Sequence, residues 1–152
     1  MGVYYLDTSV LVKLYVREPG TEQMIRLASP SSGHTLAILG LARVEFRAAV
    51  RQRERTRDVP HDAAEALIAR MEKHLQSLYL VQLVTDAVVE EAAALVDRHP
   101  LRAYDAVQLA GCLSLRSRLG ESPSFVCSDR QLLRAAEHEG LAVLDPASEL
   151  LP

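Results

Sequence analysis

Residues 1–16 read MGVYYLDTSVLVKLYV, a stretch in which a carboxylate stands between two apolar runs. The β-branched and aromatic run at residues 3–6 predicts a buried strand, and residues 9–16 predict a helix that the turn at residues 18–20 ends. A strand that leads directly into a helix starts the kind of crossover connection that parallel strands require. Asp7 stands at the junction, where a carboxylate serves either as a helix N-cap or as part of a site.

The rest of the chain repeats this alternation. Short apolar runs predict further strands at residues 34–38, 80–84, 125–127 and 142–144. Segments with helical spacing of apolar residues predict helices at 21–28, 39–53, 86–98, 103–119 and 129–138, and one that follows Pro60. Strands separated by helices cannot pair as hairpins, so we expect one domain over residues 1–152, an α/β/α three-layer sandwich with a mostly parallel central sheet. Such sheets bind ligands beyond the carboxyl ends of their strands, which is where Asp7 lies.

Composition excludes several classes of protein. The 152 residues are 49% hydrophobic and 24% charged, as in an ordinary globular protein. The net charge of -3 counts against a non-specific nucleic-acid coat protein, but it permits a nuclease whose acidic site recruits cations first. Cys112 and Cys127 have no CxxC spacing, which indicates reduced thiols and a cytoplasmic location. No apolar run reaches the roughly 18 residues needed to span a bilayer, so we expect no membrane partner.

Four carboxylates merit attention, and three of them have simple structural explanations. Asp7 is a favoured N-cap residue, and Asp105 in LRAYDAVQLA could interact with its helix dipole. Ser128 and Gln131 fit a capping box, in which case Asp129 only complements the dipole of the following helix.

Glu45 is harder to explain as a structural residue. Its neighbours at three and four residues along the helix are all apolar: Leu41, Ala42, Ala48 and Ala49. This pattern places the carboxylate on the face expected to enter the core, where it costs several kcal/mol unless an arginine or a bound cation compensates it.

Taken together, the four acids predict a cation site. Asp7 and Asp129 follow predicted strands, and Glu45 and Asp105 lie near helix starts that could face the same crevice. Carboxylates gathered there would repel one another without cations, and oxygen ligands suit Mg²⁺ or Mn²⁺. These ions promote phosphodiester hydrolysis.

The segments LDTSVLVKLYV, ARVEFRAAV, LRAYDAVQLA and FVCSDRQLLRAA, in this order, resemble the PIN-domain ribonucleases, and most closely the VapC-type toxins of toxin–antitoxin pairs. The resemblance implies a metal-dependent endoribonuclease with one or two Mg²⁺ or Mn²⁺ ions. Asp7, Glu45 and Asp105 would be metal ligands or water activators, and Asp129 a fourth acid. The resemblance also assigns Thr8 and Ser9 to supporting the site. The chain departs from the family pattern at one position. Cys127 stands where the family often has Thr or Ser, and a thiol is a poor ligand for Mg²⁺.

The resemblance further implies an RNA substrate, a cognate antitoxin and a homodimer. The antitoxin tail would lie along the apolar surface of the early helices. Leu11, Leu14, Tyr15 and Val16 could supply that groove, or they could belong to the core.

Basic residues that could contact RNA recur at four-residue steps. They are Arg43, Arg47 and Arg51 along the Glu45 helix, with Lys13 and Arg17 on the first helix, and Arg53, Arg55 and Arg57 continue the first series. The alternative is a solvated helix face with ion pairs such as that of Arg51 with Glu54.

Three other functions compete with a nuclease. A HAD-like phosphatase also begins with a strand-terminal Asp, but it needs a second Asp where this chain has Ser9. A receiver-like signalling module needs an acidic pair after the first strand, and Asp7 has no acidic neighbour. A catalytically silent PIN scaffold that binds RNA or protein is the third alternative.

Overall fold

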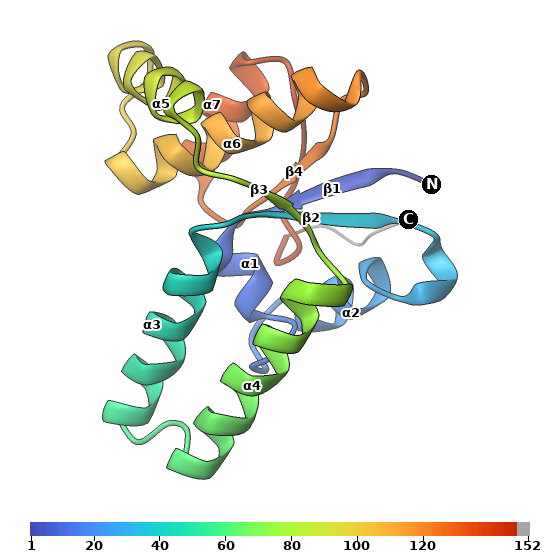
Figure 1. The fold of residues 1–152 in the computed structure, drawn as a ribbon, viewed down its shortest axis with the longest axis vertical. Helices are drawn as coiled ribbons and strands as arrows, with labels where there is room; N and C mark the ends of the chain where they lie inside the picture. The colour runs from blue at the N-terminus through green and yellow to red at the C-terminus, as the bar shows by residue number, and fades with distance from the viewer. Residues whose placement is uncertain (149–152) are drawn as a thin grey trace.

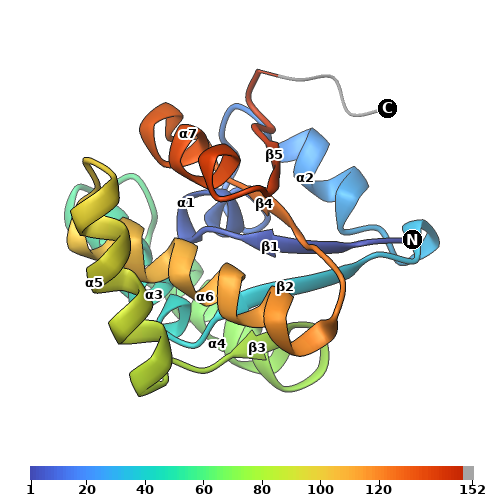
Figure 2. The same cartoon turned by 90° about the horizontal axis from the view of Figure 1, so that it is seen from above.

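Five short strands form the centre of the molecule in the computed structural model, which describes residues 1–148. They are β1 (Val3–Leu6), β2 (Thr35–Leu39), β3 (Leu80–Gln82), β4 (Ser124–Val126) and β5 (Ala142–Leu144). Their order across the sheet is β3-β2-β1-β4-β5, and each neighbouring pair is parallel (Figure 2). The predicted parallel sheet is confirmed.

Helices cover both faces of this sheet, as a three-layer sandwich requires (Figure 1). Within residues 1–148 they are α1 (Thr8–Val12), α2 (Thr21–Leu27), α3 (Ala42–Arg55), α4 (His61–Ser77), α5 (Asp86–Arg98), α6 (Ala103–Leu119) and α7 (Arg130–His138), with a 3₁₀ turn at Pro30–Ser32. Helices α1 to α4 lie on one face, and α5 to α7 lie on the other. None of the helices in this part of the chain is long and apolar enough to cross a bilayer.

Successive side chains of β1 pack into the two apolar clusters on opposite faces of the sheet. Tyr5 belongs to the apolar cluster under α5 to α7 and stacks on Phe125, with the two ring centroids 5.9 Å apart. Leu6 belongs to the cluster under α1 to α4. Strand β1 is therefore buried on both faces, which explains why residues 3–6 form a continuous apolar run.

Helix α6 approaches the sheet unusually closely at Gly111. A Cβ atom built on this glycine would lie 2.3 Å from the Tyr5 hydroxyl oxygen and 2.6 Å from Leu39 Cδ1. Glycine is required there because a side chain would occupy the space of two buried residues.

Several predicted boundaries are corrected by one to four residues. Helix α1 ends at Val12 and not at residue 16, because the following turn tightens into bonds such as that from Leu14 N–H to Leu11 O. Strand β2 includes Leu39, whose side chain is fully buried, so α3 starts three residues later than predicted. Strand β3 ends at Gln82.

The strand order places a crevice beside β1. The chain proceeds from β1 to β2 and β3 on one side, and it returns to the other side for β4 and β5. Ligands of open parallel sheets bind at such a reversal, beyond the carboxyl ends of the strands. Asp7 follows β1 directly and Asp129 follows β4 after two residues, so both lie at this end of the sheet.

Candidate functional site

One cavity of about 370 Å³ brings three of the four predicted acids together. Asp7 reaches it from the β1–α1 junction, Glu45 from the first turn of α3, and Asp105 from the first turn of α6. Thr8 and Ser9 also line this cavity, as expected for residues beside Asp7. We refer to it as the site cavity.

The Asp7 carboxylate does not cap its own helix. Asp7 occupies the N-cap position of α1, and its backbone carbonyl accepts hydrogen bonds from the N–H groups of Val10 and Leu11, yet its side chain makes no capping bond. Asp7 Oδ2 instead accepts a 2.6 Å hydrogen bond from Ser9 Oγ and a 3.6 Å contact from Cys127 Sγ. The backbone therefore starts the helix, while the carboxylate belongs to the site cavity.

Glu45 lies at the edge of the buried face of α3 and not within it. The core face is formed by Ala42, Phe46 and Val50, whereas Ala48 is exposed, so the predicted burial of Glu45 among its apolar neighbours is only half correct. Its partner is an amide and not an arginine: Gln108 Nε2 donates to Glu45 Oε1 at 2.9 Å.

Gln108 ties three elements of the site together. Its amide nitrogen also donates to Thr8 Oγ1 at 3.0 Å, so this α6 residue fixes Glu45 of α3 relative to α1. Asp105 precedes it by three residues on the same helix face. The side chain is 1% exposed, and no hydrogen-bond partner for Gln108 Oε1 is found among the described residues.

The electrostatics of the site cavity disfavour two bare negative charges. Burial raises the pKa of Asp7, the hydrogen bond from Ser9 lowers it, and the charge of Asp105 raises it further. Burial also raises the pKa of Glu45, against the hydrogen bond from Gln108. Neither Asp7 nor Glu45 forms an ion pair within residues 1–148, although Asp7 is only 8% exposed. A cation is the group that would relieve both charges.

The donor set of the site cavity fits a hard divalent ion. Asp7, Glu45 and Asp105 offer carboxylate oxygens, which are the ligands that such ions prefer. The three acids line the cavity without converging on one point: residues 1–148 contain no cluster of three or more His, Cys, Asp or Glu side chains that meets metal-ligand spacing. The residues match the ion chemically, but they do not form a closed ligand shell.

A family model described as the PIN domain matches residues 4–144, nearly the whole chain. This chain belongs to the PIN domain family. PIN domains are generally nucleases. Membership confirms the predicted family and favours a nuclease over the phosphatase and receiver-like alternatives.

Solved structures with the same fold include several toxin–antitoxin proteins. The chain aligns with VapBC2 from Rickettsia felis, bound to a DNA fragment from its promoter, at a TM-score of 0.64 and 12% identity, covering 94% of this chain and 98% of that one. It aligns with FitAcB from Neisseria gonorrhoeae at a TM-score of 0.68 and 15% identity, covering 97% of this chain and 99% of that one. The alignment with a toxin–antitoxin complex from Klebsiella pneumoniae has a TM-score of 0.65 and 17% identity, and it covers 94% of this chain and 97% of that one. At these identities the likeness establishes the fold. A comparison with curated protein sequences found no match.

Asp129 of this PIN domain is the helix cap of α7. Its Oδ1 accepts a 2.9 Å hydrogen bond from the Leu132 N–H, so the predicted capping box led by Ser128 is wrong. Ser128 Oγ donates instead to Asp145 Oδ1 at 3.1 Å. Asp129 is not among the described residues that line the site cavity. A role for this acid in the site stays a prediction.

Cys127 links Asp7 to the Asp129 turn. Its sulfur contacts Asp7 Oδ2, and the Asp129 N–H donates to that sulfur at 3.2 Å. Burial raises the pKa of the thiol far above its ordinary value, so it stays protonated and can donate to the carboxylate. The substitution that the sequence marks as a departure thus retains a donor at this position.

The predicted basic stripe is mostly paired with acids outside the site cavity. Arg43 and Arg47 both contact Glu72 of α4, at 2.9 and 3.3 Å. Arg51 contacts Glu54 at 2.8 Å, the intrahelical pair expected if the stripe is a solvated face. The exposed Arg17 contacts Glu22 at 3.2 Å.

Two of the basic residues that the sequence suggests as RNA contacts, Lys13 and Arg53, line the site cavity. Gln108 and Glu18 lie at the site and were not predicted from the sequence. Gln108 could have been found as an amide within the apolar stretch at residues 106–113, three residues after Asp105, whereas the sequence holds no comparable signal for Glu18.

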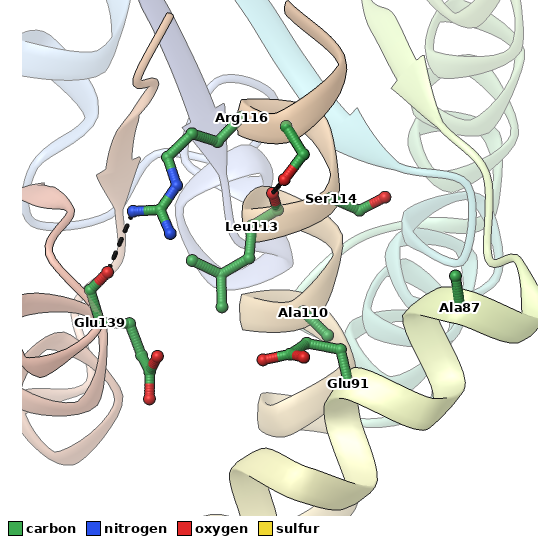
Figure 3. A pocket seen from close by; sticks show the side chains of 8 residues that line it. Ala87, Glu91, Ala110, Leu113, Ser114, Arg116 and Glu139 are labelled. Carbon is green, nitrogen blue, oxygen red and sulfur yellow. Dashed lines mark hydrogen bonds between the residues drawn. The ribbon is translucent and has the colours of Figure 1, made fainter. Parts of the chain in front are cut away.

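A second cavity, of about 380 Å³, lies on the opposite face of the sheet between α5, α6 and the end of α7 (Figure 3). Arg116 and Glu139 border it, and the Arg116 guanidinium donates to the Glu139 backbone carbonyl at 3.0 Å. It contains none of the predicted site residues.

Proposed function

We propose that this chain is a metal-dependent endoribonuclease that hydrolyses RNA phosphodiester bonds, and that it is the toxin of a VapBC-type toxin–antitoxin module. One observation carries the proposal: a PIN domain places Asp7, Glu45 and Asp105 around one cavity, and two of these carboxylates have no cationic partner within residues 1–148.

Asp7, Glu45 and Asp105 would hold a Mg²⁺ or Mn²⁺ ion, and Asp129 a second ion or a water. A bound ion of this kind supplies a water of lowered pKa and neutralises the charge that develops on the phosphate. The protein holds the acids in place. Ser9 orients Asp7, and Gln108 orients Glu45. No histidine or serine nucleophile is required.

Asp105→Asn tests this assignment. The variant should lose RNA cleavage by about 100-fold or more, because it removes a charged ligand while leaving the shape of the side chain unchanged. The assay is cleavage of a labelled structured RNA with Mg²⁺ or Mn²⁺, with chelator as the metal-free control. Retained cleavage by a pure Asp105→Asn preparation contradicts the assignment.

Metal binding can be measured without activity. Mg²⁺ at 100 times its dissociation constant should stabilise the wild-type protein by about 2.7 kcal/mol, seen as a rise in melting temperature. Asp7→Asn should reduce this rise, and Arg98→Gln on the opposite face should not. A silent PIN scaffold would bind RNA and yet show neither cleavage nor this metal-dependent shift.

An apolar cavity of about 500 Å³ offers a place for the antitoxin tail. Tyr15 and Val16 line it together with Leu67 of α4, whereas Leu11 is fully buried in the core and cannot contribute. Leu14 borders a smaller neighbouring cavity. Light scattering of the chain, alone and with the product of the neighbouring small gene, tests both the antitoxin and the homodimer. We also propose a cytoplasmic location, because Cys112 and Cys127 are both free thiols.

A further inference from the structure

The site cavity has a cationic side as well as an acidic one. Lys13 follows α1 directly, and Arg53 lies in the last turn of α3, and both border the same cavity as Asp7 and Glu45. The Lys13 side chain is only 10% exposed. A cation so deeply buried needs a partner of opposite charge.

Glu18 is that partner for both cations. Its Oε2 accepts from Lys13 Nζ at 3.2 Å, and its Oε1 accepts from the Arg53 guanidinium. The turn that carries Glu18 is held in place by Thr21, whose Oγ1 accepts a 2.9 Å hydrogen bond from the Glu18 N–H. The Glu18 carboxylate thus forms ion pairs with both cations at the wall of the cavity.

Arg53 lies on the same face of α3 as Glu45, one of the acids of the site cavity. Glu45, Ala49 and Arg53 recur every four residues along α3, and all three line the cavity. Arg53 lies about 12 Å from Glu45 along the helix axis, and the small Ala49 leaves the space between them open. An RNA strand with one phosphate at the acids would bring a flanking phosphate toward the cations.

We infer that Lys13 and Arg53 contact the phosphate that flanks the scissile one, and that Glu18 competes with RNA for both cations. A phosphate and a carboxylate are alternative partners for the same guanidinium and ammonium groups. RNA must therefore displace Glu18. The other arginines of the stripe, Arg43 and Arg47, already pair with Glu72 outside the cavity.

This inference rests on the proposed nuclease function, and RNA binding tests it apart from cleavage. The probe is a fluorescein-labelled single-stranded RNA of mixed sequence, and the readout is anisotropy in the Asp105→Asn background with Mg²⁺. Lys13→Met and Arg53→Gln should each weaken binding about tenfold and reduce the slope of log affinity against log salt by about 0.7. Lys13→Arg and Arg53→Lys should restore much of the affinity.

Glu18→Gln gives the sharper result because it should tighten binding, by about three- to tenfold, and misfolding cannot tighten binding. In the active protein the same change should lower KM more than it alters kcat. Matched controls lie on the opposite face, where Arg98 contacts Glu91 at 3.0 Å: Arg98→Gln and Glu91→Gln should change affinity less than about twofold.

Two outcomes overturn the inference: Glu18→Gln weakens RNA binding or leaves it unchanged, or the Lys13 and Arg53 variants match the Arg98 control. Failure of the proposed function is a separate result, in which the wild-type chain cleaves no RNA with either metal.

Discussion

The close approach of α6 to the sheet leads to a quantitative prediction for Gly111→Ala. Alanine favours a helix over glycine by about 1 kcal/mol, so an unobstructed site would gain stability. Here the new methyl group would lie 2.3 Å from the Tyr5 hydroxyl oxygen and 2.6 Å from Leu39 Cδ1, both inside the core. Overpacking of this kind costs about 3 kcal/mol, which leaves a net loss of about 2 kcal/mol. Urea unfolding followed by circular dichroism measures it, and the melting temperature should fall by roughly 4–8 °C.

The same change should also impair the site. Helix α6 carries Asp105 and Gln108, so moving it away from the sheet moves both relative to Asp7. A misplacement of about 1 Å can lower kcat/KM on the order of 100-fold. The loss should exceed what the unfolded fraction explains at 25 °C.

Tyr5→Phe provides the control. The Tyr5 hydroxyl is buried without a hydrogen-bond partner among the described residues, so removing it alone should leave stability unchanged or raise it. In that background Gly111→Ala should cost at least about 1 kcal/mol less, because the closest atom is gone. If Gly111→Ala were as stable and as active as the wild type, Tyr5 and Leu39 would not limit how far α6 lies from the sheet.

Two further predictions concern charge. Burial lowers the pKa of His74, whose Nδ1 lies 2.7 Å from the Tyr15 hydroxyl oxygen. The unfolded chain therefore binds a proton at His74 more readily than the folded one, and the free energy of unfolding should fall as the pH drops below about 6.5. Urea titrations at several pH values should show a shallower decline for His74→Asn. Joint neutralisation of Arg47 and Arg51 should leave RNA affinity and its salt slope within about twofold of the wild type, because both arginines already pair with acids of α3 and α4. If the affinity measured by anisotropy instead fell by on the order of tenfold, these arginines would be RNA contacts.

The sequence predicts the architecture well because its signals are local. Short apolar runs alternate with helical periods, and this alternation determines a parallel sheet covered by helices. The least accurate boundaries are those at α1 and α3, where tertiary packing decides the end of an element: Leu39 continues β2 because the core buries it.

The site is predictable only in part, because spacing along the chain does not report side-chain direction. Asp7, Glu45 and Asp105 meet in one cavity as expected. Asp129 has the same kind of sequence context, yet its carboxylate turns back to cap α7. The bond of Gln108 to Glu45 joins residues 63 positions apart, and the sequence contains no rule for such a pairing.

The central place of β1 has a consequence for when the protein becomes complete. This strand is the first to be synthesised, yet the contact of Asp7 with Cys127 spans 120 residues. At ribosomal speeds of about 5–20 residues per second, the first strand waits on the order of ten seconds for β4. A growing chain therefore has an open edge at its first strand until β4 has been made. Asp7 acquires its contact with Cys127 only after that point.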